Sequence, residues 1–263
     1  MADLLGDLAA EQAQVDVLLD DLSPEQWEMP AATCAWTFKE ELLHIAAFDW
    51  AAVELVNGRG ATVTEVADAS FGHDEMHRVT AYTHLTGREV LTGWRTVRSR
   101  LVTAFAAADP KQRVPWAPGL PMAAKSLVSA RLMELWAHSV DLYDALGREP
   151  VVKDRIASTL FLSWQARPNA YRINGLELPD TPLYLDVTLP SGAHWTKGDP
   201  EAADRITGTA RDWALVAVRR RRWQDTDLVI VGDEAHRFAD VVQTFAGEAA
   251  APPTALPVVT PVA

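Results

Sequence analysis

The sequence predicts an all-α four-helix bundle over residues 1–150, then a smaller α+β domain over residues 151–247 and a disordered tail over residues 248–263. Before Pro150, four long segments repeat apolar residues at helical spacing. After Pro150, apolar and polar residues begin to alternate with period two, as they do in strands. From Ala249 onward, Ala, Pro and Thr dominate and leave little apolar surface to bury. Two folded domains also suit a chain of 263 residues.

The composition is that of an ordinary globular protein, with 48% apolar and 23% charged residues. No apolar run approaches the ~20 residues that a membrane-spanning helix needs. The chain opens with acidic residues, whereas a signal peptide opens with basic ones. The formal charge of -12 disfavours nucleic acids, because affinity for phosphates rests on Lys and Arg. We therefore expect a cytoplasmic protein that acts on small molecules and binds neither nucleic acid nor membrane.

The first two helices are bounded by recognisable start and stop signals. Helix one covers residues 3–22 and ends at Ser23-Pro24-Glu25, which also starts a short turn. Helix two begins after Thr37, which forms a capping-box pattern with Glu40 three residues later. It ends at Asn57-Gly58, where glycine permits the conformation that commonly terminates a helix.

The rest of the N-terminal domain contains a predicted loop and two further helices. Residues 59–86 are polar and are expected to form a loop with a single helical turn. Helix three fits Arg88–Ala108 and is terminated by Asp109-Pro110. Helix four fits Ala123–Leu146 and is terminated by Gly147. With the first two, these amphipathic helices make up the bundle.

The second domain mixes helices and strands. Helices are predicted near residues 153–166, 210–220 and 234–245, strands over 183–189 and 228–231, and turns at 190–192 and from Ile206. The strand over 228–231 is purely apolar and is expected to be buried.

A polar stripe within apolar segments indicates a metal site. Glu134 and His138 lie four residues apart on helix four, on one face, and Asp141 continues that face. His44 lies in an equally apolar stretch of helix two, where unpaired charge would be costly. Helical bundles bind metals between facing helices, and two imidazoles with one carboxylate leave a coordination position open. We expect His44, Glu134 and His138 to bind zinc or another divalent metal, with Asp141 orienting a ligand imidazole.

Other interpretations of these residues remain open. His44 and His138 are also compatible with hydrogen-bonded core histidines, and Glu134 with an ion pair to an arginine such as Arg131. The single cysteine, Cys34, excludes an internal disulfide, and it is a further ligand, a reactive thiol or a small buried side chain. The remaining candidates in the predicted loop are expected to be solvated: His73, His77 and His84.

Two segments carry a resemblance to a known family. Residues Trp36-Thr-Phe-Lys-Glu-Glu-Leu-Leu-His44-Ile-Ala-Ala-Phe-Asp49 and Ala130-Arg-Leu-Met-Glu134-Leu-Trp-Ala-His138-Ser-Val-Asp141 resemble the mycothiol-dependent maleylpyruvate isomerase family. That family belongs to the DinB-like metal-binding bundles, and the match implies zinc held by His44, Glu134 and His138. Residues 204–208, 210–215 and 231–235 look like its C-terminal module, which is related to sterol carrier proteins. The resemblance covers nearly the whole chain.

The resemblance implies a reaction that uses the thiol mycothiol as cofactor or co-substrate. Metal coordination would deprotonate a thiol, and the thiolate could attack an electrophilic carbon, leading to isomerisation or to S-transfer. Arg222 and Arg237 are candidates to bind a carboxylate of substrate or thiol at a domain interface. The alternatives are a metal-dependent hydrolase, or a non-catalytic protein that binds a metal and a small ligand.

Overall fold

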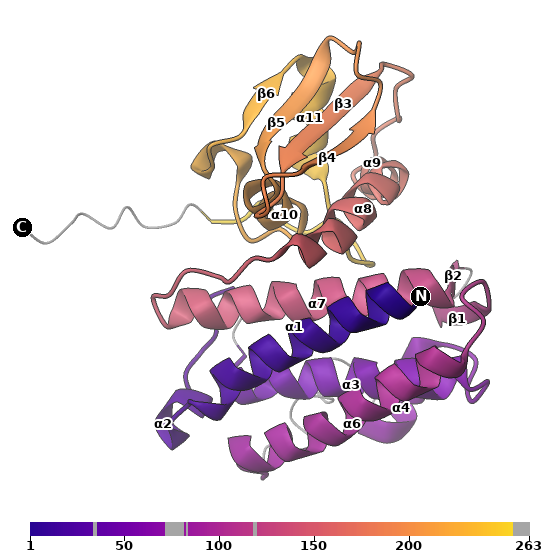
Figure 1. The fold of residues 1–263 in the computed structure, drawn as a ribbon, viewed down its shortest axis with the longest axis vertical. Helices are drawn as coiled ribbons and strands as arrows, with labels where there is room; N and C mark the ends of the chain where they lie inside the picture. The colour runs from indigo at the N-terminus through magenta and orange to yellow at the C-terminus, as the bar shows by residue number, and fades with distance from the viewer. Residues whose placement is uncertain (34–35, 72–81, 83, 118–119, 255–263) are drawn as a thin grey trace, which may run out of the picture. The chain divides into compact units, whose positions relative to one another are not determined.

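The computed structural model describes residues 1–33, 36–71, 82, 84–117 and 120–254. It divides into two units, Met1–Pro150 and Val151–Ala263 (Figure 1). No helix among the described residues is long and apolar enough to cross a membrane.

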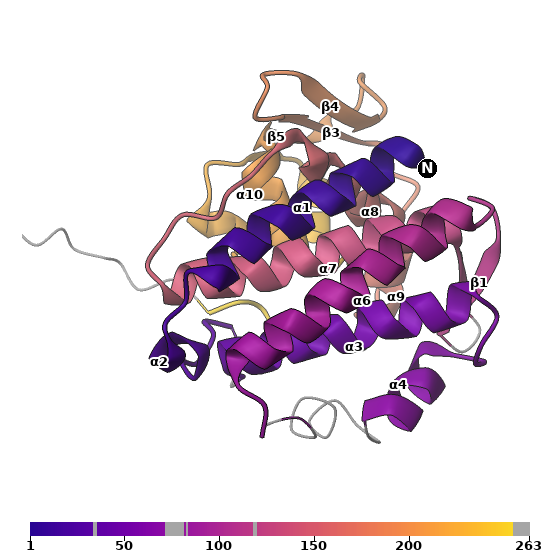
Figure 2. The ribbon, with the colours of Figure 1, turned by 60° about the horizontal axis from the view of Figure 1, so that its bottom comes forward.

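Four long helices form the frame of the first unit. They are α1 (Ala2–Asp20), α3 (Phe38–Val56), α6 (Gly87–Ala107) and α7 (Ala124–Ala145). Each packs against two of the others (Figures 1 and 2). Helix α1 contacts α6 and α7, and α3 also contacts α6 and α7. The helices start within one residue of their predicted bounds, and side-chain caps explain two of the starts: Thr37 with Glu40 and Thr86 with Glu89 form capping boxes.

The first unit also contains elements that the sequence did not predict. Strands β1 (Arg113–Ala117) and β2 (Leu120–Ala123) form an antiparallel pair, so the expectation of an all-α unit is corrected. Prolines at positions 115 and 121 interrupt the alternation that would have identified these strands. A short helix, α2 (Pro24–Trp27), follows α1.

The polar segment after α3 includes a regular helix, α4 (Val63–Phe71), which is longer than the single turn expected there. Its first turn is capped by Thr62, whose hydroxyl accepts from the backbone N–H of Glu65 at 3.2 Å. Val63 and Val66 are buried against the end of α3, and tertiary packing therefore stabilises a helix that the sequence pattern alone did not reveal.

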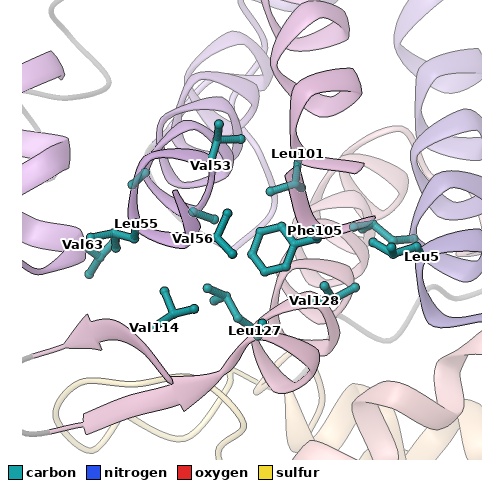
Figure 3. Packing of buried hydrophobic residues seen from close by; sticks show 14 of the residues in the cluster. Leu5, Val53, Leu55, Val56, Val63, Leu101, Phe105, Val114, Leu127 and Val128 are labelled. Carbon is teal, nitrogen blue, oxygen red and sulfur yellow. The ribbon is translucent and has the colours of Figure 1, made fainter. Parts of the chain in front are cut away.

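The apolar core of the first unit consists of two clusters. Figure 3 shows one of them, which includes Leu5, Val56, Phe105 and Leu127. On α3 it begins near Ala51, whereas the other cluster ends near Ile45 on the same helix. On α7 the first cluster reaches Leu132 and the second begins at Leu135. Polar side chains of α3 and α7 lie where the two clusters meet.

A buried ion pair joins α3 to α7 at that boundary. Arg131 Nε donates to Asp49 Oδ1 at 2.8 Å, and the indole of Trp94 on α6 donates to Asp49 Oδ2 at 3.2 Å. The side chains of Arg131 and Asp49 are only 2% and 4% exposed. Burial raises the pKa of Asp49, while the bonds from Arg131 and Trp94 act in the opposite direction. Removing one partner would leave a buried charge uncompensated.

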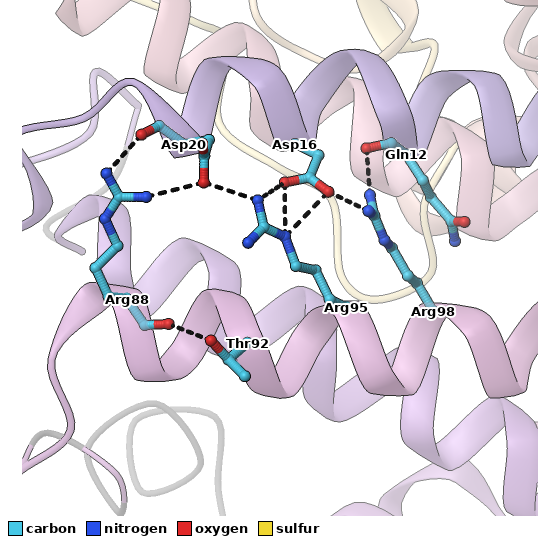
Figure 4. A network of polar contacts seen from close by, with 7 residues as sticks. All are labelled: Gln12, Asp16, Asp20, Arg88, Thr92, Arg95 and Arg98. Carbon is cyan, nitrogen blue, oxygen red and sulfur yellow. Dashed lines mark hydrogen bonds and ion pairs between the residues drawn. The ribbon is translucent and has the colours of Figure 1, made fainter.

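A second polar network joins α1 to α6 at the surface. Arg95 donates to both Asp16 and Asp20, Arg98 pairs with Asp16, and Arg88 pairs with Asp20 (Figure 4). Arg88, Arg95 and Asp20 are solvent-accessible, so salt screens the pairs with Asp20 and each of them contributes little to stability, whereas Asp16 and Arg98 are more buried.

The second unit is a four-stranded sheet with helices. Its sheet order is β4-β3-β5-β6, from β3 (Leu183–Thr188), β4 (His194–Gly198), β5 (Asp204–Thr209) and β6 (Val229–Val231). Only β3 and β5 are parallel. The helical segments are η1 (Asp154–Ile156), α8 (Ala157–Gln165), α9 (Arg167–Ile173), α10 (Ala210–Ala217), η2 (Trp223–Asp225) and α11 (Asp233–Val241).

Three predictions for the second unit are corrected. Ile206 lies inside strand β5 and not in a turn. The local sequence pattern did not reveal this strand, because its parallel pairing with β3 is a long-range contact. The apolar strand β6 is an edge strand whose Val229 and Val231 are exposed. Helix α11 ends at Val241, before the predicted end. Most of the predicted tail lies outside the described residues, although Ala250 donates to Gln243 at 2.9 Å.

Two glycines of α6 should respond oppositely to replacement by alanine. A Cβ at Gly87 would lie 2.1 Å from the buried ring of Trp27, whereas a Cβ at Gly93 would meet nothing within 4 Å. We expect Gly87→Ala to lower the free energy of unfolding by ~1–3 kcal/mol through overpacking. Gly93→Ala should raise it by ~0.5–1 kcal/mol, because alanine favours a helix. Urea unfolding of both variants tests this, and equal effects would contradict the packing of Trp27.

The Asp49–Arg131 pair can be tested by a double-mutant cycle. Asp49→Leu or Arg131→Met alone should lower the free energy of unfolding by ~3–5 kcal/mol, because each leaves one buried charge without its partner. The double variant should recover most of this loss, since no buried charge remains. Additive losses in the cycle would mean that the pairing is not the source of the stability.

Candidate metal centre

The candidate centre lies between α3 and α7, at the boundary of the two apolar clusters. His44 lies in the second turn of α3, and Glu134 and His138 lie one turn apart on α7. Because α3 and α7 pack against each other, residues about 90 positions apart in the sequence come together. The structure therefore brings together all three residues expected to bind a metal.

The three side chains have a separation that fits one divalent ion. Each offers a ligand atom, and these atoms lie within 4.8 Å of one another. The distance from His138 Nε2 to Glu134 Oε2 is 3.5 Å. Two donors about 2.1 Å from a tetrahedral metal lie roughly 3.4 Å apart, so this pair already has the required spacing. The ring centroids of His44 and His138 are 4.8 Å apart. Two imidazoles and a carboxylate suit zinc or a similar metal.

Glu134 is the charged member of this trio. Burial raises the pKa of its carboxyl, but the hydrogen bond and charge of His138, followed by the charges of Arg131 and His44, lower it to about 2. The carboxyl is thus ionised at neutral pH, which is the form that binds a metal, and a bound metal would take the place of the proton through which His138 Nε2 interacts with Glu134. Arg131 makes its ion pair with Asp49, so the structure differs from the alternative in which Arg131 is the ion-pair partner of Glu134.

The other ring nitrogen of His138 faces a different set of acids. His138 Nδ1 forms a short hydrogen bond with Glu41 Oε2, and Asp141 Oδ2 lies 3.9 Å from the same nitrogen. Asp141 also accepts a hydrogen bond from the hydroxyl of Thr33. Glu41, His138 and Asp141 form a second group whose ligand atoms lie within 4.8 Å of one another.

The two sides of His138 differ in access to solvent. The side chains of Glu134 and His138 are 23% and 14% exposed, whereas those of Glu41 and Asp141 are 1% exposed. A ligand arriving from solvent could therefore reach the side that carries His44, Glu134 and His138. The side of Glu41 and Asp141 is closed.

Aromatic rings border the site. The ring centroid of Trp36 lies 5.0 Å from that of His44 and 6.4 Å from that of His138, and Phe48 lies 4.8 Å from His44 on another side. Trp116 packs against Phe48 at 6.2 Å. These rings shield His44 from bulk water, and they give the site an apolar border that would strengthen electrostatic interactions within it.

The remaining candidates do not join this cluster within the described part of the chain. His84 is exposed, while Cys34, His73 and His77 lie outside the described residues. The sequence did not identify Glu41, although it lies three residues before His44 and thus one turn away on the same helix. The sequence signal that could have identified Glu41 is an acidic residue within a mostly apolar helix.

The two arginines proposed to bind a carboxylate both lie in the second unit. Arg222 follows α10 and forms a two-bond ion pair with Asp225, at 2.7 and 2.8 Å. Arg237 is an exposed residue of α11.

Comparisons with known proteins agree with the fold and with the resemblance stated above. Residues 8–143 match the family model described as the mycothiol maleylpyruvate isomerase N-terminal domain. The chain is 32% identical over 248 residues to the uncharacterized protein Rv0036c of Mycobacterium tuberculosis strain H37Rv, and equally to MT0041 of strain CDC 1551. Each alignment spans 92% of this chain and 95% of the relative.

Two solved structures share the fold at low sequence identity. The crystal structure of a mycothiol-dependent maleylpyruvate isomerase superposes with a TM-score of 0.57 at 15% identity. A histidine-to-alanine mutant of such an enzyme superposes with a TM-score of 0.60 at 14% identity. Both matches cover 83% of this chain and 89% of the solved chain. The family model covers more than half of the chain, and the chain therefore belongs to the mycothiol maleylpyruvate isomerase N-terminal domain family.

Proposed function

We propose that this protein is a metal-dependent enzyme that uses a low-molecular-weight thiol, mycothiol, for S-transfer to, or isomerisation of, a small electrophilic substrate. The observation that carries the proposal is the convergence of His44, Glu134 and His138 in a member of this family. The proposal assigns residues 1–150 to a DinB-like metal-binding four-helix bundle and residues 151–247 to a sterol-carrier-like domain.

The three donors have distinct parts in the proposed site. His44 and His138 would supply neutral nitrogens and Glu134 an ionised oxygen, so a divalent ion would keep one positive charge and an open position. A metal bound there would supply a lowered pKa for a coordinated thiol, making the thiolate available at neutral pH. Trp36 and Phe48 would shield the imidazole of His44 and limit the amount of water around the bound thiol and electrophile.

Both reaction types use the same nucleophile, and the solved relatives favour one of them. The solved structures that share this fold are those of mycothiol-dependent maleylpyruvate isomerases, and this similarity supports isomerisation. We retain Arg222 and Arg237 as proposed binders of a substrate or thiol carboxylate. Because Arg222 already pairs with Asp225, an incoming carboxylate would have to compete for its guanidinium. Arg237 is the more accessible of the two.

The proposed metal site predicts that replacing one of its ligands weakens metal binding. The purified protein should bind about one zinc or similar ion per chain, since one set of donors converges on the open side. His138→Ala should weaken binding by more than the roughly 10–100-fold that loss of an outer partner costs, because it removes a ligand. His84→Ala is the matched control and should bind as the wild type does. Chelator competition measures both affinities, and equal losses would place the site elsewhere.

Thiol coordination makes a second prediction. Cobalt-loaded protein should develop a sulfur-to-metal charge-transfer band when mycothiol is added, because three protein donors leave room for a thiolate. A proton should be released at the same time, and calorimetry in buffers of different ionisation enthalpy counts it. Glutathione, tested in parallel, measures the selectivity for mycothiol.

If neither the band nor the proton appeared at saturating thiol, with metal occupancy demonstrated, thiol activation would be wrong. A hydrolytic reaction that uses bound water would then be the function to test first.

A further inference from the structure

The two nitrogens of His138 face chemically different surroundings. Nε2 points to the open side, where Glu134 Oε2 lies 3.5 Å away and His44 is adjacent. Nδ1 points to the closed side, where it is hydrogen-bonded to Glu41 Oε2. A neutral imidazole carries one proton and one lone pair, so only one of its nitrogens can bind a metal.

The carboxylate of Glu41 beside Nδ1 determines which ring nitrogen of His138 carries the proton. An ionised carboxylate only accepts hydrogen bonds, so Glu41 favours the tautomer with hydrogen on Nδ1. The lone pair is then on Nε2, the nitrogen that faces Glu134. We propose that Glu41 is a positioning residue that fixes the Nδ1–H tautomer and the ring orientation of His138 so that Nε2 binds the metal. This inference rests on the metal site of the proposed function.

Glu41 fits this part better than Asp141, the residue expected from the sequence. Asp141 Oδ2 is 3.9 Å from Nδ1, which is beyond hydrogen-bonding distance, and Thr33 donates to its other oxygen. Glu41 also lies one turn before His44 on α3. Its bond to His138 therefore ties the ligand of α7 to the helix that carries the other histidine ligand.

The space beside Glu41 and His138 on the closed side is small. The cavity that Glu41 and His138 line has a volume of about 10 Å³, which is close to the minimum for one water molecule. The group of Glu41, His138 and Asp141 could hold a cation with all three residues only if Nδ1 carried the lone pair, and Nε2 would then be protonated and lost to the open side. The exposure of Glu134 favours the open side as the binding side.

The tautomer of His138 can be observed directly. In protein labelled with nitrogen-15 at histidine, two-bond proton–nitrogen spectra distinguish a protonated Nδ1 from a metal-bound Nε2, and His138→Ala assigns the signals. Zinc-loaded wild-type protein should contain His138 with hydrogen on Nδ1. Glu41→Gln should give a mixture of tautomers, because an amide can donate or accept, and should weaken zinc binding by about 10–100-fold. Glu41→Asp, which keeps the carboxylate, should recover part of both.

Glu54→Gln, the same substitution farther along α3, is the matched control and should change neither the tautomer nor the zinc affinity. Metal bound through Nδ1 in the wild type, a measurement that does not require the Glu41 variants to fold, would overturn the inference. So would a Glu41→Gln variant with unchanged tautomer and affinity, or a second zinc ion lost in that variant alone. Absence of any saturable zinc site in the wild type would instead refute the proposed function itself.

Discussion

The buried ion pair between Asp49 and Arg131 constrains how α3 and α7 face each other, and the candidate site depends on that arrangement. A buried charge is tolerated only next to its partner, so the helices cannot slide by a turn without exposing both charges to an apolar environment. Trp94 adds a third helix, α6, to the same constraint. His44 lies five residues before Asp49, and Glu134 lies three residues after Arg131, so the pair fixes the opposition of the donors as well.

Local signals in the sequence were sufficient for the long helices. The Thr37–Glu40 capping box begins α3 and the glycine after Asn57 ends it, and each signal involves only a few neighbouring residues. Strand β5 was misassigned because its residues pair with β3 and β6, which lie well outside any local window. The short strands of the first unit were missed for a related reason, since prolines hide their alternation.

Some residues of the candidate site could likewise be predicted from local sequence patterns, and others could not. Glu134 and His138 were identified because four-residue spacing places them on one face, and His44 because it lies in an equally apolar stretch of the second predicted helix. Glu41 could not be paired with His138 from the sequence, because 97 positions separate them and only the packing of α3 on α7 brings them together. The same holds for Asp49 and Arg131, whose sequence separation is 82.

The known proteins that match this chain differ in how similar they are to it. The chain matches its mycobacterial relative over nearly its full length, whereas the solved isomerases share the fold at 14–15% identity. A common frame of helices with so few shared residues leaves most side chains around the site free to differ. Under the proposed function, substrate choice would then depend on residues that border the site, such as Trp36 and Trp116.

The ion pairs between α1 and α6 bear on how the protein is made. Helix α1 ends at Asp20, and α7, against which it packs, begins only at Ala124. At ~5–20 residues per second, a ribosome needs about 5–20 s to synthesise the roughly 100 residues between them. During this interval the face of α1 that packs against α7 has no partner, but all charged side chains of α1 are acidic. Repulsion between these acidic side chains opposes association of nascent copies of this helix until the arginines of α6 emerge and pair with Asp16 and Asp20.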